Sequence, residues 1–342
     1  MSIWLTLTAA VTAMVIAAIS GMALIPYLRK IHFGQTILEE GPAWHKSKQG
    51  TPIMGGFMFI GGSILATALG YTVYRLSGNL DTTSKEAAVQ GLRLLTVVLF
   101  SLLYSLTIGF TDDYIKAVKK QNLGLNPKQK MAAQLVLSIA LLGILYLLGD
   151  HETTIDLMFV KLDFGIFYYP VMILFIIYIS NAVNLTDGID GLCGSVTVVS
   201  MLALTILCAS MKFLDMSLYA ITIAGACIGF LVWNLHPAKC FMGDTGSMYL
   251  GGAFAAIGVT CRMHLLLVMV GIVYVLDALS VVLQVLYFKY TKKKYGEGRR
   301  IFKMSPIHHH FELCKWSEYK IVTVFSLVGL LFGGLAVLLQ IL

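Results

Sequence analysis

The sequence predicts an all-α, polytopic integral membrane protein, and three observations support this fold class. Of the 342 residues, 58% are hydrophobic and only 13% are charged, whereas a soluble globular domain carries about 25% charged residues. The mean hydropathy is +0.81. The apolar runs are continuous rather than alternating, which favours membrane helices over a β-barrel. Together these properties exclude a soluble enzyme, a coiled coil and a disordered chain.

Ten runs have the length of a membrane-spanning helix, which needs about 20 mostly apolar residues. No basic segment precedes the first run, so we expect a spanning helix there rather than a cleaved signal peptide. The eighth run is short and rich in glycine. Short loops join the runs, and we therefore expect one integral-membrane domain over residues 1–342. The ten runs lie near residues 2–28, 51–74, 94–111, 131–149, 168–186, 192–211, 216–235, 246–261, 263–288 and 321–341.

The basic residues predict the orientation of these ten transmembrane helices. Of the 25 lysines and arginines, 19 lie in the loops that follow the odd-numbered runs. Cytoplasmic loops are enriched in Lys and Arg, so these loops are expected inside, with the N- and C-termini outside. Much of the net charge of +7 then reflects topology and attraction to anionic lipid rather than nucleic-acid binding.

Clusters of unusual polar residues follow the same runs and therefore lie on the predicted cytoplasmic face. The predicted outer loops contain nothing comparable. Five separated clusters on one face predict a single active site at the inner membrane surface. The clusters span residues 46–52, 109–114, 181–191, 233–237 together with 241–247, and 305–312.

Five carboxylates in three of the clusters, Asp112, Asp113, Asp187, Asp190 and Asp244, indicate a divalent cation. Asp112 and Asp113 are adjacent at the end of an apolar run, and two neighbouring carboxylates stay ionised only near a cation. Asp244 lies between two glycines, which let a phosphate or a metal approach the backbone. Oxygen ligands without a nearby cysteine favour Mg²⁺ or Mn²⁺ over zinc. The alternative for Asp112 and Asp113 is a solvated helix end that pairs with Lys116.

A second pattern repeats a polar residue every three positions, at Asn181, Asn184, Asp187 and Asp190. Neighbouring members share a broad helix face, and a 3₁₀ turn would align them fully. Two glycines within the stretch suggest that the backbone bends there and brings amide groups near a ligand. The alternative is a glycine-rich turn with capping Asx residues.

Three consecutive histidines, His308, His309 and His310, lack the i, i+4 spacing of a helical zinc pair. We expect them to donate to phosphate or sugar groups, with a solvated turn as the alternative. Lysines between residues 116 and 130 are suitable phosphate ligands, although positive-inside topology alone also explains them. Asp277 lies within the ninth run and is left outside the expected site.

Acids, a hard cation and basic groups at a lipid boundary suit phosphate transfer from a soluble donor to a lipid acceptor. Five motifs carry a specific resemblance: KQGTPIMGG, GFTDDY, NAVNLTDGIDGL, FMGDTGS and SPIHHHFE. Through them the chain resembles the polyprenyl-phosphate N-acetylhexosamine-1-phosphate transferases over nearly its whole length. The Ser-Pro prefix of the triple histidine resembles the muramoyl branch more than the N-acetylglucosamine branch.

The resemblance implies a single catalytic domain that acts in peptidoglycan synthesis in the bacterial cytoplasmic membrane. It implies transfer of phospho-N-acetylmuramoyl-pentapeptide from its UDP-linked donor to undecaprenyl phosphate, giving lipid I and UMP, with Mg²⁺ or Mn²⁺. The partners would be these two substrates and membrane lipid, without nucleic acid, and a homodimer stays open. The alternatives are a UDP-N-acetylglucosamine:polyprenyl-phosphate phosphotransferase and a membrane transporter, although the chain lacks the repeated halves of many transporters.

By motif, the resemblance also implies residue roles. Asp244 would hold the metal and, with Asp112, Asp113 and His309, would form the catalytic group. A carboxylate could act as a general base or as the nucleophile of a two-step route. Direct attack is favoured because a lipid phosphate with a second pKa of about 6 is already dianionic near pH 7. The substrate-binding residues would be Lys48, Lys116, Lys120, Lys130 (with Lys128 as its alternative), Asn184, Asp187, Asp190, Asn234, Phe241 (stacked on uracil) and His308.

Overall fold

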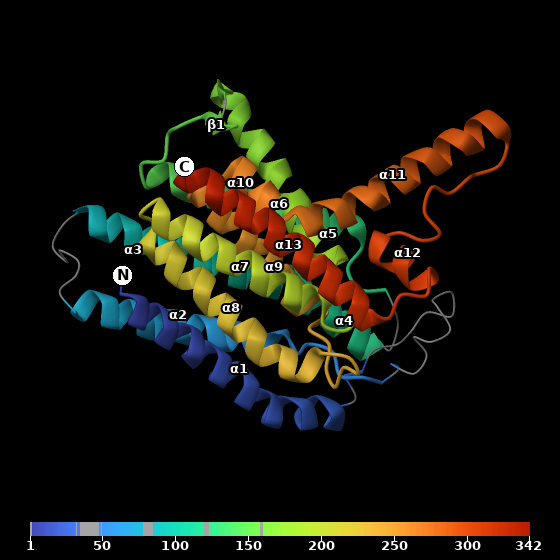
Figure 1. Cartoon of the computed structure of the whole chain (residues 1–342), viewed down its shortest axis with the longest axis horizontal. Coiled ribbons are helices and arrows are strands. Elements are labelled where there is room, and N and C mark those ends of the chain that lie inside the picture. The colour runs from blue at the N-terminus through green and yellow to red at the C-terminus, as the bar shows by residue number, and fades with distance from the viewer. Residues whose placement is uncertain are drawn as a thin grey trace.

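The computed structural model of the chain describes residues 2–31, 33–34, 48, 50–77, 85–119, 123–157 and 160–342. Helices make up nearly all of it, and its named strands form one antiparallel hairpin (Figure 1). The chain is therefore an all-α polytopic membrane protein, as the sequence predicted. Its elements are α1 (Ile3–Lys30), α2 (Gly56–Leu76), α3 (Lys85–Tyr104), η2 (Ser105–Phe110), α4 (Thr111–Lys119), α5 (Pro127–Leu147), β1 (Thr154–Asp156), β2 (Lys161–Asp163), η3 (Gly165–Phe167), α6 (Tyr168–Leu185), α7 (Leu192–Ser210), α8 (Leu214–Asn234), α9 (Gly243–Thr260), α10 (His264–Val270), α11 (Ile272–Tyr295), α12 (Ile307–Leu313) and α13 (Glu318–Ile341).

Nine helices in the described ranges are long and apolar enough to cross a membrane. Nine of the ten predicted runs correspond to them. The eighth run forms α9, a helix of 18 residues that is not among the nine. The ninth run, residues 263–288, is not one continuous helix, because it divides at Gly271 into α10 and α11.

Helix α9 occupies the centre of the bundle, which explains its composition. Every residue from Thr245 to Thr260 is buried, and the helix packs against α2, α3, η2 and α6. A helix enclosed by other helices needs no apolar face toward lipid. Small residues therefore suit it, because they allow neighbouring backbones to approach closely.

A π-helical segment, η2, joins α3 to α4 beside the N-terminal end of α9. Gly109 in η2 lies against α9 so closely that a Cβ there would come within 2.2 Å of the carbonyl oxygen of Asp244. The Ser105 hydroxyl donates a hydrogen bond of 2.7 Å to the carbonyl of Thr245. π-helical turns frequently occur at functional sites. Here the segment brings the first residues of α4 next to the first residues of α9.

Figure 1 shows both chain termini toward the left and α4 and α12 toward the right. Helix α11 projects away from the bundle at its upper right, and α12 packs against α11 and α13. The polar clusters that α4 and α12 carry thus lie at the end away from the termini. The orientation of this end toward the cytoplasm stays a prediction.

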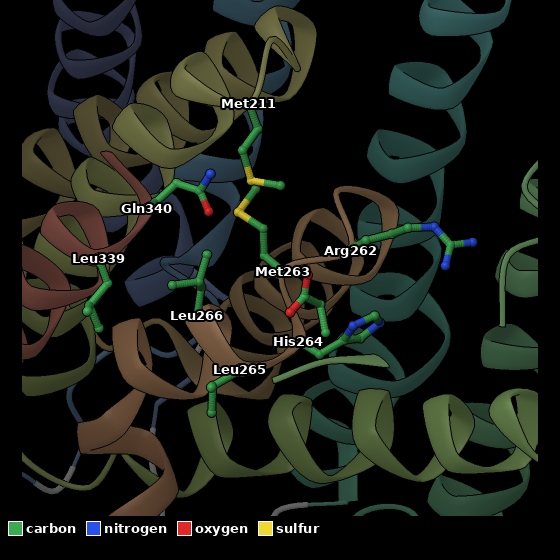
Figure 2. A pocket seen from close by; sticks show the side chains of 9 residues that line it. Met211, Arg262, Met263, His264, Leu265, Leu266, Leu339 and Gln340 are labelled. Atoms are coloured by element: carbon green, nitrogen blue, oxygen red, sulfur yellow. The ribbon is translucent and has the colours of Figure 1, made fainter. Parts of the chain in front are cut away.

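A cavity of about 230 Å³ opens beside α10, and Figure 2 shows the side chains of Met211 and Met263 pointing toward one another there. Arg262 and His264 also line it. These residues follow the C-terminal end of α9, whereas Asp244 lies in its first turn. A helix of 18 residues is about 27 Å long, so this cavity is remote from the acidic residues.

Candidate active site

Asp112, Asp113 and Asp244 lie together where the start of α4 meets the start of α9. One carboxylate oxygen from each lies within 4.8 Å of the others. Asp112 and Asp113 are buried, and the side chain of Asp244 keeps 19% of its surface exposed. Three acids from two separate motifs therefore lie close together, and Asp244 is the most accessible of them.

Asp113 binds the first turn of α9. Its Oδ1 accepts a hydrogen bond from the backbone N–H of Asp244 at 3.1 Å. Its Oδ2 accepts from the backbone N–H and the hydroxyl of Thr245, at 2.8 and 2.7 Å. The first N–H groups of a helix lack partners within the helix, and a negative charge is favourable there. Asp113 therefore fixes the position of Asp244.

Asp112 faces two lysines instead. Its oxygens lie 2.6 Å from the ammonium of Lys116, one turn later on α4, and 3.0 Å from that of Lys130 on α5. The carboxylate also accepts a hydrogen bond from the backbone N–H of Leu125 at 2.7 Å. The ion pair that the sequence offered as an alternative to a functional role is thus present, within a larger network.

Asp244 joins this network from the other side. Lys130 lies 2.8 Å from its Oδ2, and Lys116 lies 3.5 Å away. The amide of Asn184, near the end of α6, donates to its Oδ1 at 3.1 Å. The same amide donates to the hydroxyl of Ser247 at 2.7 Å. Two lysines and Asn184 therefore contact the carboxylate of Asp244. Of the two lysines that the sequence offered as alternatives, Lys130 lies in this network, and Lys128 is exposed.

The donor chemistry of the three acids fits a hard divalent cation. Every ligand they offer is a carboxylate oxygen, which suits Mg²⁺ or Mn²⁺. Three carboxyl groups face two ammonium groups, so a divalent cation would favour the ionised form of all three. The cluster could therefore hold a metal ion, and its composition does not favour zinc.

Asp187 lies in the turn between α6 and α7, close to this cluster. Desolvation raises the pKa of Asp187 to about 8, and the negative charges of Asp244, Asp113 and Asp190 act in the same direction. Near neutral pH, and without a cation, the side chain of Asp187 is therefore mostly protonated and can donate a hydrogen bond. A cation or another positive group would favour its ionised form.

A second charged cluster contains Lys48, Asp190, His236 and Glu318. The ammonium of Lys48 lies 2.7 Å from Asp190 and 2.8 Å from Glu318. His236 Nδ1 lies 3.0 Å from Asp190 and 3.4 Å from Glu318. The structure therefore brings together two predicted residues, Lys48 and Asp190, with two that the sequence did not single out.

His308 is paired with Asp277, and both side chains are fully buried. Asp277 lies 2.8 Å from His308 Nδ1 and accepts a hydrogen bond of 3.3 Å from its backbone N–H. The opposite ring nitrogen, Nε2, has no hydrogen-bond partner among the described residues. It lies so close to Gly188 that a Cβ on that residue would be only 2.2 Å from this nitrogen. Asp277 thus directs His308 toward the turn that carries Asp187, although sequence reasoning left Asp277 outside the site.

The two other histidines have different surroundings. His309 Nδ1 lies 2.5 Å from a carboxylate oxygen of Glu312 on the same short helix, α12. His310 accepts a hydrogen bond of 3.1 Å from the backbone N–H of Lys303. Of the three consecutive histidines, His308 is therefore the one buried against the Asp187 turn.

Asn234 and Phe241 connect the loops around the site. The buried amide of Asn234 accepts from the backbone N–H of Gly191 at 3.1 Å and donates to the carbonyl of Cys240 at 2.9 Å. Phe241 forms backbone hydrogen bonds of 2.8 Å with Pro52 and with Gly55. Lys120, which the sequence also predicted as a phosphate ligand, lies outside the described residues.

Sequence reasoning missed His236 and Glu318. His236 lies in one of the polar clusters and precedes a proline. This position was the one sequence feature that could have indicated a role for it. Glu318 lies in the first turn of α13, where an acidic residue is ordinarily explained by the helix dipole. Its partner Asp190 is 128 residues away, so no local pattern links them.

Comparisons with known proteins find similar sequences over nearly the whole chain. Residues 95–262 match glycosyl transferase family 4. Three similar proteins are each named phospho-N-acetylmuramoyl-pentapeptide-transferase. That of Halalkalibacterium halodurans is 43% identical over 332 residues (97% of this chain and 96% of that one). That of Shouchella clausii is 43% identical over 337 residues (98% and 97%), and that of Listeria welshimeri is 39% identical over 339 residues (98% and 98%). This chain belongs to the phospho-N-acetylmuramoyl-pentapeptide-transferase family.

Proposed function

We propose that this enzyme transfers phospho-N-acetylmuramoyl-pentapeptide from its UDP-linked donor to undecaprenyl phosphate, releasing UMP and forming lipid I. It acts as a phospho-sugar transferase of peptidoglycan synthesis, in the bacterial cytoplasmic membrane. The observation that carries the proposal is the cluster of three carboxylates and two lysines at one end of an apolar helix bundle. The identity of the substrates is inferred from membership of the family.

The cofactor we propose is Mg²⁺, which Mn²⁺ could replace, with Asp244 as a ligand. When bound, the cation would neutralise the donor diphosphate and stabilise the leaving UMP. Lys116 and Lys130 already face Asp244 and Asp112. We propose that they bind phosphate oxygens of the substrates, because a lysine ammonium is a strong point charge for phosphate.

We propose that the lipid phosphate attacks the donor directly. Both oxygens of Asp113 accept hydrogen bonds from the start of α9, which supports a positioning role for Asp113 rather than a nucleophilic one. Asp112, which faces both lysines, is the better candidate to orient the acceptor phosphate. Bringing the two phosphates together in a fixed geometry accounts for much of the rate of such a reaction.

The donor would lie between the acidic cluster and the second charged cluster. We propose that Asn184, Asp187, Asn234 and Phe241 form the nucleotide pocket, with the Phe241 ring stacked on uracil. The hydrogen bonds on both sides of the Phe241 backbone support this role, because they limit its movement. The sugar and its phosphate would contact Lys48, Asp190, His308 and His309.

The test is a product assay with purified protein. With the UDP-linked muramoyl-pentapeptide, undecaprenyl phosphate and Mg²⁺, we expect a lipid-linked product and UMP, and radiolabelled UMP should exchange into the donor. UDP-N-acetylglucosamine should not replace the donor. Product from that sugar would assign the chain to the other branch. Folded protein that forms no product and exchanges no UMP would favour a transporter and overturn the proposal.

A further inference from the structure

The first turn of α13 is bound to two loops that come from distant parts of the chain. Glu318 contacts the turn that ends at Asp190. The hydroxyl of the next residue, Tyr319, donates to the carbonyl of His236. Asp190 in turn accepts from the backbone N–H of Ala238 at 3.0 Å. The start of α13 therefore holds the turn after α6 and the turn after α8 in one arrangement.

Glu318 makes the central contacts in this arrangement. Its carboxylate accepts a hydrogen bond of 3.0 Å from the backbone N–H of Asp190 and lies 2.8 Å from the ammonium of Lys48. Lys48 is 270 residues away in the sequence. Only 11% of the Glu318 side chain and 14% of the Lys48 side chain are exposed. A charge pair shielded to this extent is screened less by water and salt than a surface pair.

The negative charge of Glu318 alone would repel an anionic donor. It can favour donor binding only by holding a cationic group in place. A diphosphate would be repelled by Asp190 and by Glu318, which together carry two negative charges. Lys48 lies between them and has a long, flexible side chain. Two carboxylates on different elements restrict its ammonium far more than either one could alone. The local arrangement thus fixes a cation beside the proposed sugar-phosphate region.

We propose that Glu318 is a positioning residue for the donor, which acts by holding Lys48 and the Asp190 turn in the geometry that receives the sugar phosphate. This inference rests on the proposed function. An acidic residue that only stabilised the helix dipole would need no buried partner. Glu318 instead has both a buried backbone partner and a nearly buried cation.

A double-mutant cycle in donor kinetics tests this role. Glu318→Gln keeps an oxygen that can accept from the Asp190 N–H but loses the charge that holds Lys48. We expect it to raise the KM for the donor about tenfold, the size of a lost charge-assisted hydrogen bond, with kcat nearly unchanged. Lys48→Met should raise the KM at least as much. Since Glu318 acts through Lys48, the double variant should resemble Lys48→Met alone.

Controls separate positioning from folding. Glu297→Gln removes a carboxylate from an exposed position after α11 and should leave the donor KM unchanged. Thermal unfolding of each variant should match that of the wild type within a few degrees. The inference would be overturned if the KM increases of Glu318→Gln and Lys48→Met multiplied in the double variant. It would also be overturned if the KM increase of Glu318→Gln accompanied a loss of thermal stability.

Direct titration with the UDP-linked donor tests the positioning role of Glu318 separately from the proposed transfer reaction. Wild-type protein that binds this donor but forms no lipid product would contradict the proposed transfer. In that case weaker donor binding by Glu318→Gln would still support the positioning role, and unchanged binding would refute it. Wild-type protein that neither binds the donor nor forms product would refute both.

Discussion

Replacing Asp113 with asparagine should weaken the junction of α4 with α9 and, through it, the reaction. An asparagine side chain can keep the two bonds to Thr245 through its single oxygen, but its amide nitrogen then faces the Asp244 N–H, which is also a donor. The lost charge-assisted bond is worth about 1.5–3 kcal/mol. The lost negative charge at the N-terminus of α9 adds about 0.3–1 kcal/mol. We therefore expect a loss of about 3 kcal/mol.

Thermal unfolding of purified protein, measured at one scan rate, detects this loss. For a chain of this size we expect Asp113→Asn to lower Tm by roughly 5 °C and to reduce turnover at least a hundredfold, because Asp244 moves. Asp112→Asn should reduce turnover similarly with a smaller change in Tm, since its lysine partners are 31% and 25% exposed and can be solvated. A wild-type Tm in an inactive Asp113→Asn would show that Asp113 acts on substrate directly, and would refute the positioning argument.

Four further predictions use the same preparations. Lys130→Met should lower kcat/KM at least tenfold, whereas the exposed Lys128→Met should stay near wild type, and equal effects would contradict the assignment of Lys130. EDTA should abolish transfer and added Mg²⁺ should restore it, so full activity in EDTA would exclude an essential exchangeable cation. Because the pKa of Asp187 is raised to about 8, its ionisation destabilises the cation-free fold as pH rises from about 4 to 8. The Tm of wild type should then fall over this interval more than that of Asp187→Asn, and parallel pH profiles would contradict the raised pKa. Gly188→Ala should impair donor binding, because its Cβ would meet the His308 ring, and unchanged donor KM would argue against a close fit there.

The sequence could predict the acidic cluster because hydropathy separates polar residues from membrane helices so clearly. Asp112, Asp113 and Asp244 each stand at the edge of an apolar run, on the side that positive-inside topology predicts to be cytoplasmic. Because these helix ends are confined to one face of the bundle, residues far apart in sequence had little space in which to separate. That constraint predicted the meeting of these acids without any information about helix packing.

Other parts of the site depended on packing that local patterns do not encode. The role of Asp113 follows from the contact of α4 with α9 through η2, and the sequence contains no signal for a π-helical turn. Asp277 was ambiguous for a related reason, since a carboxylate within a membrane segment indicates a partner but does not identify it. His308 proved to be that partner, on a helix of seven residues beyond the end of α11.

The enclosure of α9 also has a consequence for how the protein is assembled in the membrane. A segment rich in glycine and alanine gains less free energy from contact with lipid tails than a leucine-rich one, so it has a weak tendency to insert alone. Its stability depends on α3 and α6, which are synthesised earlier. We therefore expect the insertion of α9 to wait for its neighbours, and substitutions that loosen these contacts to lower the yield of protein before they lower the activity of what remains.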